Sequence, residues 1–186
     1  MTLITPQAVP EVLLIEPKRF GDERGFFSET YSAKVLASAG FTGAFVQDNH
    51  SRSPRRGTVR GLHFQAPPFA QDKLLRVTRG AILDVAVDIR RGSPTYGKAV
   101  AVELSTENWR QLLVPKGFAH GFQTLTEDCE VLYKVTDYYA PAAEAGLLWS
   151  DPALDIAWPG VEPTINDRDA AWPCLADFDS PFTYEG

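Results

Sequence analysis

Residues 81–89 read AILDVAVDI and contain the clearest secondary-structure signal in the chain. Apolar residues at positions 83, 85, 87 and 89 alternate with Asp84, Ala86 and Asp88. A period of two places these two sets on opposite faces of an extended chain. The stretch therefore predicts a β-strand with one strongly apolar face.

Similar short runs on both sides of this strand predict an all-β fold. Turn residues such as Arg79-Gly80 and Gly92-Ser93-Pro94 separate them. Many short strands at regular spacing are typical of a sandwich or barrel, including the double-sheet jelly roll. The other predicted strands span residues 12–16, 24–31, 45–47, 58–65, 74–79, 98–104, 111–114, 121–125 and 130–139.

Helical patterns are weak outside one short segment. Residues 32–39 predict a helix that ends before Gly40. The chain from Asp151 onward is rich in Pro, Asp and Trp, which predicts a loop-rich C-terminal segment over the β core. We expect Trp149, Trp158 and Trp172 to pack there rather than to contact a substrate.

Composition limits the possible functions. A length of 186 residues predicts one domain, and a net charge of −6 argues against nucleic-acid or anionic-membrane binding. Two cysteines form neither a disulfide framework nor a zinc ligand set. The N-terminus lacks the pattern of a signal peptide, and no stretch is long enough to span a bilayer. We therefore expect a cytoplasmic protein.

The histidines His63 and His120 are the first candidates for chemistry, although a lone histidine is usually a structural residue. Residues 115–120 have a P-x-G-x-x-H spacing that resembles the second half of the cupin signature, which belongs to a jelly-roll family. Metal-binding cupins have His-x-His in the first half, whereas this chain has His63-Phe64-Gln65. Because Gln65 is a poor ligand beside an imidazole, the donors are too few for a stable metal site. We expect a cupin scaffold without metal.

An ordered set of sequence blocks makes the resemblance more specific. Each block alone is a weak signal, but together they cover most of residues 10–170 in one order and spacing. The set resembles the dTDP-4-dehydrorhamnose 3,5-epimerase family. The blocks are FGDERGFFSETY (20–31), FVQDNHS (45–51), VRGLHFQ (59–65), QDKLLRV (71–77), DVAVDIRRGSPTYG (84–97), VPKGFAHGF (114–122), LYKVTDYYAP (132–141) and LLWSDPALDIAWP (147–159).

The resemblance implies a cofactor-independent isomerase that acts on a dTDP-linked 4-keto-6-deoxyhexose. Protons at C3 and C5 of such a sugar are acidic because these carbons flank the C4 ketone. Inverting both carbons of dTDP-4-dehydro-6-deoxy-D-glucose gives dTDP-4-dehydro-L-rhamnose, a precursor for surface polysaccharide. The reaction needs a base on one face of the sugar, an acid on the other, and stabilisation of the enolate between them.

The same resemblance implies roles for individual residues. His63 resembles the base, Asp169 the carboxylate that orients it, and Tyr133 the acid on the opposite face. Such a carboxylate fixes the imidazole tautomer and stabilises its charged form. Lys73 and His120 resemble the groups near the C4 oxygen and the sugar, where a cation would stabilise the enolate.

Further residues resemble the family's substrate contacts. Tyr139 resembles the residue that stacks on thymine, and Arg60 resembles a phosphate contact. Arg168 stands where the family usually has lysine, a cation that differs in reach and hydration. The remaining contacts implied are Gln47, Asn49 and Glu144, together with Arg24 and Glu29 from the partner of a homodimer that exchanges N-terminal strands.

Strand geometry adds two expectations. Strict alternation would place Arg60 and His63 on opposite faces, but a glycine within a strand often marks a bulge. We expect Gly61 to re-aim one of these side chains so that both reach one pocket. Tyr133 and Tyr139 have the same parity, so one regular strand would place them on the same face about 20 Å apart at roughly 3.3 Å per residue.

Three other functions remain open on the residues alone. Epimerases that act at C3 or C5 only share the same catalytic residues. A metal-dependent cupin oxygenase would contain a transition metal, and a non-catalytic sugar-binding module would not need His63. The basic run 52–56, RSPRR, is interpreted as a solvated loop outside the site.

Overall fold

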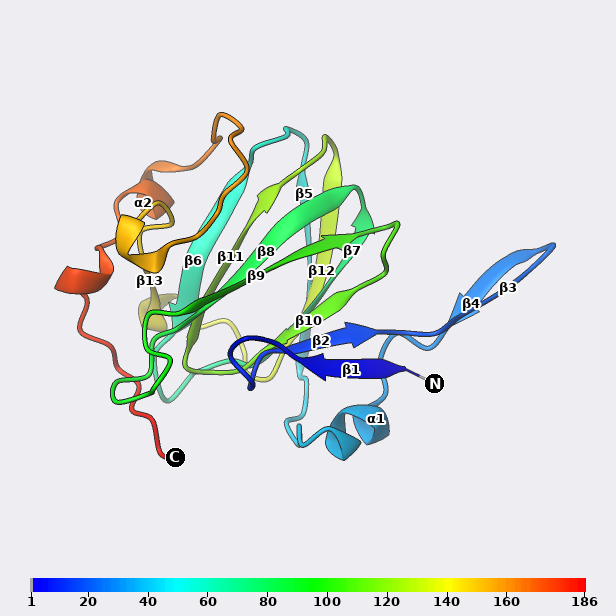
Figure 1. Cartoon of the computed structure of the whole chain (residues 1–186), viewed down its shortest axis with the longest axis horizontal. Coiled ribbons are helices and arrows are strands. Elements are labelled where there is room, and N and C mark those ends of the chain that lie inside the picture. Colours follow the sequence, from blue (N-terminus) through cyan, green and yellow to red (C-terminus); the bar gives the residue numbers. More distant parts are fainter. Residues whose placement is uncertain (1) are drawn as a thin grey trace.

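The strand predicted from AILDVAVDI lies inside one of two antiparallel sheets that pack face to face (Figure 1). The computed structural model describes residues 2–186. The five-stranded sheet has the order β13 (Glu144–Gly146), β6 (Val59–Gln65), β11 (Phe118–Thr124), β8 (Ala81–Asp88) and β9 (Ala99–Ser105). The six-stranded sheet has the order β1 (Leu3–Pro6), β2 (Leu13–Glu16), β10 (Gln111–Val114), β7 (Lys73–Arg79), β12 (Cys129–Val135) and β5 (Gln47–Ser53).

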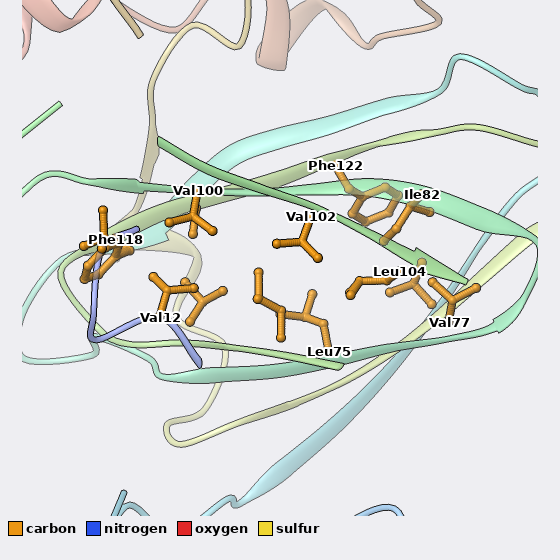
Figure 2. Packing of buried hydrophobic residues seen from close by; sticks show 14 of the residues in the cluster. Val12, Leu75, Val77, Ile82, Val100, Val102, Leu104, Phe118 and Phe122 are labelled. Carbon is orange, nitrogen blue, oxygen red and sulfur yellow. The ribbon is translucent and has the colours of Figure 1, made fainter. Parts of the chain in front are cut away.

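Apolar side chains fill part of the space between the sheets (Figure 2). Leu75 of β7, Ile82 of β8 and Leu104 of β9 are almost completely buried in this cluster. Each such side chain contributes about 1.5–3 kcal/mol through its removal from water. This inter-sheet core fixes the distance and register between the sheets, and hence the width of the cleft that continues from it.

A second apolar cluster covers the outer face of the five-stranded sheet. Val85 and Val87 of β8 belong to it, and Trp149 and Trp158 pack against it, as predicted. Strand β8 is therefore buried on both faces, and Asp84 lies between the sheets rather than in solvent. The alternation of the sequence identified the strand correctly, but its polar positions face the interior.

Helices are short, as predicted. Helix α1 (Ala33–Ser38) lies within the predicted segment 32–39. The C-terminal segment consists of loops with helix α2 (Asp167–Ala170) and the 3₁₀ turns η2 (Pro152–Leu154) and η3 (Leu175–Asp177), while η1 (Pro141–Ala143) precedes β13. Among residues 2–186, no helix is long and apolar enough to cross a membrane.

Several strand boundaries differ from the predictions. Strand β5 runs to Ser53, so it includes the beginning of the basic run interpreted as a loop. Its side chains alternate between the two faces without an apolar pattern, because one face points to solvent and the other to a polar cleft. The predicted strand 130–139 ends at Val135, and the sequence reading missed strand β1 and the separate strand β3 (Arg19–Asp22).

Strands β3 and β4 (Gly25–Ser28) pair with each other and project from the two sheets as a hairpin (Figure 1). Phe20, Phe26 and Phe27 on this hairpin are more than half exposed. Arg24 lies at the turn, where its guanidinium pairs with Asp22. The hairpin therefore presents an aromatic surface that is largely exposed, although Phe26 packs edge-on against Trp109.

Candidate active site

A cleft of about 380 Å³ opens between the sheets beside the apolar core. Strands β6 and β11 form one wall, and strands β5, β7 and β12 form the other. All predicted site residues line it except Arg24 and Glu29. The predicted residues that line the cleft are Gln47, Asn49, Arg60, His63, Lys73, His120, Tyr133, Tyr139, Glu144, Arg168 and Asp169.

A bulge at Gly61 brings Arg60 and His63 to the same cleft, as predicted. His120 pairs with His63 and Phe122 pairs with Arg60, so strand β6 has one residue more than β11 over this interval. Gly61 has φ +122°, and a Cβ there would lie 2.6 Å from the Cα of Gly121. Only glycine combines this backbone conformation with such close contact. The extra residue shifts the alternation, and both side chains line the cleft.

Asp169 forms a hydrogen bond with the His63 ring. The distance from His63 Nε2 to Asp169 Oδ1 is 2.8 Å, and the backbone N–H of Gly61 donates to Oδ2 at 3.1 Å. Burial raises the pKa of Asp169, but the hydrogen bonds from His63 and Gly61 and the Arg168 charge outweigh it, so its pKa is lowered. An ionised Asp169 favours a proton on Nε2, which leaves Nδ1 as the basic nitrogen of His63.

Helix α2 delivers this carboxylate. Asn166 is its N-cap and accepts a hydrogen bond from the backbone N–H of Asp169 at 2.7 Å. Capping fixes the first turn of a helix that is too short to be stable alone. The Asp169 side chain is therefore set against β6 although it lies more than a hundred residues away in sequence.

Tyr133 faces the cleft from strand β12, on the sheet opposite His63. Burial raises the pKa of the Tyr133 phenol, an effect only partly offset by the charge of Arg60. The phenol is therefore protonated at neutral pH and able to donate a proton. The two side chains that the sequence reading assigned as base and acid thus lie in one cleft on opposite walls.

Lys73 and His120 form the inner part of the cleft. Burial lowers the pKa of Lys73 to about 8, although the charges of Asp84 and Glu144 act in the opposite direction. The Lys73 ammonium donates one long hydrogen bond, 3.4 Å, to the His63 carbonyl. His120 Nε2 lies 2.8 Å from Asp84 Oδ1, and burial lowers the pKa of this histidine. The inner cleft thus contains a weakly bound cation and a neutral imidazole.

Tyr139 reaches the cleft by another route than the one predicted. The chain leaves the sheet after Val135, because Thr136 turns to bond Asp72 through its backbone N–H and its hydroxyl. The prediction that Tyr133 and Tyr139 share one regular strand is therefore wrong. Tyr139 still lines the cleft, and its hydroxyl donates to Glu144 Oε2 at 2.9 Å.

Arg168 pairs with the same carboxylate. Its Nη1 atom lies 2.8 Å from Glu144 Oε2, and its Nε atom lies 3.6 Å from Asp169 Oδ1. Arg168 therefore connects Glu144 to the His63–Asp169 pair. Arg24 lies on the projecting hairpin and Glu29 lies beyond it, so neither lines the cleft of its own chain. Their contribution from a partner chain stays a prediction.

Gln65 occupies the position at which metal-binding cupins have their second histidine. Its side-chain amide is buried and bonded to backbone groups, while Phe64 points into the outer apolar cluster. In the part of the chain that the structure describes, no three His, Cys, Asp or Glu side chains are grouped to hold a metal ion. The absence of a cofactor stays a prediction.

Sequence reasoning missed three residues of the site. Asp84 supports His120, Asn166 caps the helix of Asp169, and Ser51 lines the cleft with a buried hydroxyl. Asp84 had a usable signal, since it is the polar residue in the middle of an otherwise apolar strand. Asn166 also had one, as an N-cap residue type before Asp167.

Comparison with known proteins identifies the family of this chain. A family model described as dTDP-4-dehydrorhamnose 3,5-epimerase matches residues 6–177. The chain belongs to this family. A dTDP-4-dehydrorhamnose 3,5-epimerase from Shigella flexneri is 51% identical over 172 residues, which cover 92% of this chain and 94% of the relative.

The chain also resembles solved structures of dTDP-sugar epimerases. RmlC from Legionella pneumophila, in complex with dTDP-4-keto-L-rhamnose, matches with a TM-score of 0.95 and 46% identity over 100% of both chains. ChmJ, a 3′-monoepimerase from Streptomyces bikiniensis, has a TM-score of 0.87 and 35% identity, covering 92% of this chain and 87% of that one. The chain is therefore an isomerase with the cupin jelly roll of the dTDP-4-dehydrorhamnose 3,5-epimerases, and the single-site enzyme is more distant.

Proposed function

We propose that this epimerase binds dTDP-4-dehydro-6-deoxy-D-glucose in the cleft and inverts C3 and C5 by proton transfer between His63, the sugar and Tyr133. The observation that supports this assignment best is the position of the two side chains on opposite walls of one cleft, with Asp169 bonded to the imidazole. A carbon next to the ketone loses a proton to one wall and becomes a planar enolate, which then gains a proton from the other wall on its opposite face. That sequence of events inverts the carbon.

The reaction at each carbon has two proton transfers. His63 Nδ1 takes the proton next to the ketone, and the C–H electron pair moves into an enolate with its charge on the C4 oxygen. The Tyr133 hydroxyl then delivers a proton to the opposite face of the same carbon. Exchange with solvent returns the proton to Tyr133 and removes it from His63. General acid–base groups of this kind each contribute about 10²–10⁴-fold.

Lys73 stabilises the enolate. Its side chain is partly buried, and among residues 2–186 the ammonium has only one long hydrogen bond, so it is free to bind an oxyanion. A cation in a water-poor site stabilises developing charge more strongly than it would in water. Neutral His120, held by Asp84, supplies a further hydrogen-bonding nitrogen beside the sugar.

The outer cleft binds the nucleotide. Arg60 and Arg168 contact the diphosphate, which suits guanidinium groups because each can hold two phosphate oxygens. Tyr139 stacks on the thymine ring, and Gln47, Asn49 and Glu144 complete the contacts. The complex of the Legionella relative with dTDP-4-keto-L-rhamnose supports a dTDP-sugar as the ligand.

The functional enzyme is a cytoplasmic homodimer whose subunits each form one epimerase domain. Arg24 and Glu29 of each chain contact the nucleotide held by the other. The projecting hairpin with its exposed Phe20, Phe26 and Phe27 supports this arrangement, because a partner would cover an aromatic surface that is otherwise left in water.

Turnover in deuterated water tests the assignment. We expect deuterium at both C3 and C5 of the product, whereas label at one carbon alone would identify a single-site epimerase. The variant His63→Asn should lose turnover by at least about 10³-fold and bind dTDP like the wild type. Near-native turnover of this variant would exclude His63 as the base.

A further inference from the structure

Side-chain amides hold the segment that carries Tyr139. After strand β12 ends at Val135, residues 136–140 leave the sheet, and the side chains of Tyr138 and Tyr139 are 66% and 55% exposed. Such exposed rings are not oriented by core packing, so the orientation of Tyr139 depends on its backbone and on the hydrogen bond from its hydroxyl to Glu144. Three glutamines from other parts of the chain bind that backbone, and we call them the glutamine cradle: Gln47, Gln65 and Gln71.

Gln65 of strand β6 is the centre of the cradle. Its Nε2 donates to the carbonyl oxygens of Phe69 at 2.7 Å and Tyr138 at 3.1 Å. Its Oε1 accepts from the backbone N–H of Ala140 at 2.8 Å. The residue is only 5% exposed, and its amide uses both N–H donors and its acceptor on the loops at the cleft mouth.

The other two glutamines bind the same segment from either side. Gln71 Nε2 donates to the carbonyl of Asp137 at 2.8 Å. Gln47 Oε1 accepts from the backbone N–H of Tyr139 at 3.2 Å, while its Nε2 donates to Asn49 Oδ1 at 2.8 Å. The backbone around the exposed rings is therefore bonded to strand β5, to strand β6 and to the loop before strand β7.

The cradle replaces the sheet that the segment has left. A glutamine amide has the carbonyl acceptor and N–H donor of a peptide group plus one further N–H donor, so it can substitute for a neighbouring strand. The substitution also ties the segment to β6, where Gln65 lies on the same strand as His63. The position that holds a second metal-binding histidine in other cupins thus has a mechanical task in this chain.

We propose that the glutamine cradle, with Gln65 at its centre, positions Tyr139 for stacking on the nucleotide base and thereby sets the affinity of the enzyme for the thymidine part of its substrate. This inference rests on the proposed function, in which Tyr139 stacks on thymine. Gln65 and Gln71 are positioning residues, since they act through the backbone of residues 136–140. A stacking ring that is fixed beforehand binds the base without a further loss of conformational freedom.

Binding of two ligands separates positioning from a general structural effect. Calorimetry with dTDP and with inorganic pyrophosphate would be carried out on the wild type, Gln65→Glu and Gln65→Ala. Glutamate keeps the size of the side chain but turns an oxygen toward the carbonyls of Phe69 and Tyr138. We expect dTDP affinity to fall by about tenfold or more, the usual effect of a lost buried hydrogen-bond partner. Pyrophosphate affinity should stay within twofold, and KM should rise at nearly constant kcat.

Two further variants keep the test decisive. Gln71→Ala removes one outer contact of the cradle and should weaken dTDP in the same direction but less, which covers the case of a misfolded Gln65 variant. Gln123→Ala is the matched control, because Gln123 is a buried glutamine that bonds the carbonyls of Gly57 and Val161 away from the cleft. It should leave the affinities for both ligands unchanged.

The variant Tyr139→Ala tests the stacking role of Tyr139 separately from the positioning role of the glutamine cradle. If it weakens dTDP while the folded Gln65 and Gln71 variants bind dTDP like the wild type, the cradle inference is wrong and the stacking role stands. Equal losses of dTDP and pyrophosphate affinity in the Gln65 variants would likewise overturn it. If Tyr139→Ala itself binds dTDP normally, the stacking role fails and the inference fails with it.

Discussion

Two carboxylates on strand β8 have opposite relations to their surroundings. Asp88 and Asp84 are both fully buried between the sheets. Asp88 accepts hydrogen bonds from Arg90, Ser93 and Thr95, which outweigh the effect of burial and lower its pKa. Asp84 accepts one from His120 on Oδ1, and its Oδ2 has no hydrogen-bond partner among residues 2–186.

Asp84, unlike Asp88, keeps unused hydrogen-bonding capacity beside the cleft. Buried polar groups in native proteins are nearly all paired, so an exception needs an explanation. Among residues 2–186, four buried side-chain atoms lack a hydrogen-bond partner, and two of them, Ser51 Oγ and Asp84 Oδ2, belong to the site, while the other two belong to Gln123 and Trp172. The Lys73 ammonium, also in the cleft, has one long hydrogen bond among the described residues. The saturated Asp88 network holds structure, and the unsaturated cleft is left to bind a ligand.

Of the buried carboxylates, Asp169 should be the most important for turnover. Replacing it in Asp169→Asn removes the charge that orients His63, so kcat should fall by about 10²–10⁴-fold. Its neighbour Asp167 is exposed on the same helix and provides the control Asp167→Asn, with expected kcat within twofold. Steady-state kinetics of both variants measure the difference. Similar kcat values for the two variants would contradict the assignment.

A cavity in the inter-sheet core should lower the stability of the protein without affecting turnover, whereas Asp169→Asn should lower turnover. Leu104 is completely buried away from the cleft, so Leu104→Ala should lower the free energy of unfolding by about 2–5 kcal/mol. Turnover per folded molecule should stay within twofold of the wild type. Urea unfolding and kinetics on the same preparations measure the effects on stability and on turnover separately. A large loss of kcat in folded Leu104→Ala would show that the two effects are not separate.

The pH dependence of catalysis should reveal the buried ammonium. Lys73 stabilises the enolate only when protonated, and burial lowers its pKa to about 8. As pH rises through about 8 the charged form is lost, so kcat/KM should decline about tenfold per pH unit above that value. The raised pKa of Tyr133 keeps the phenol protonated over this range. Lys73→Met should lack this decline; a decline that persists unchanged would assign it to another group.

The smallest expected effect concerns Arg168, where the family usually has lysine. Lysine keeps the positive charge but loses the planar fork that bonds Glu144 and approaches Asp169. Arg168→Lys should therefore raise KM by less than about tenfold, or roughly 1.4 kcal/mol, with kcat within twofold. A fall in kcat as large as that of Asp169→Asn would place Arg168 in the chemical step instead.

The sequence predicted the strands with clear alternation because their side chains face two different environments. It identified β8 and the family blocks, and through them the residues that line the cleft. It failed where tertiary contacts decide the structure: β12 ends at Val135 because Thr136 and the glutamine cradle take over the backbone of the chain. Strand β5 escaped notice because its inward face is polar, as a cleft requires, and not apolar.

Isotope exchange without inversion tests most directly whether base and acid act from opposite walls. The substrate would be incubated in deuterated water with Tyr133→Phe and with His63→Asn, and C3 and C5 would be followed by NMR. We expect Tyr133→Phe to exchange these protons through His63 without inverting either carbon at a significant rate, and His63→Asn to exchange neither proton. Exchange retained in His63→Asn, or lost in Tyr133→Phe while the variant binds dTDP normally, would contradict this assignment of base and acid.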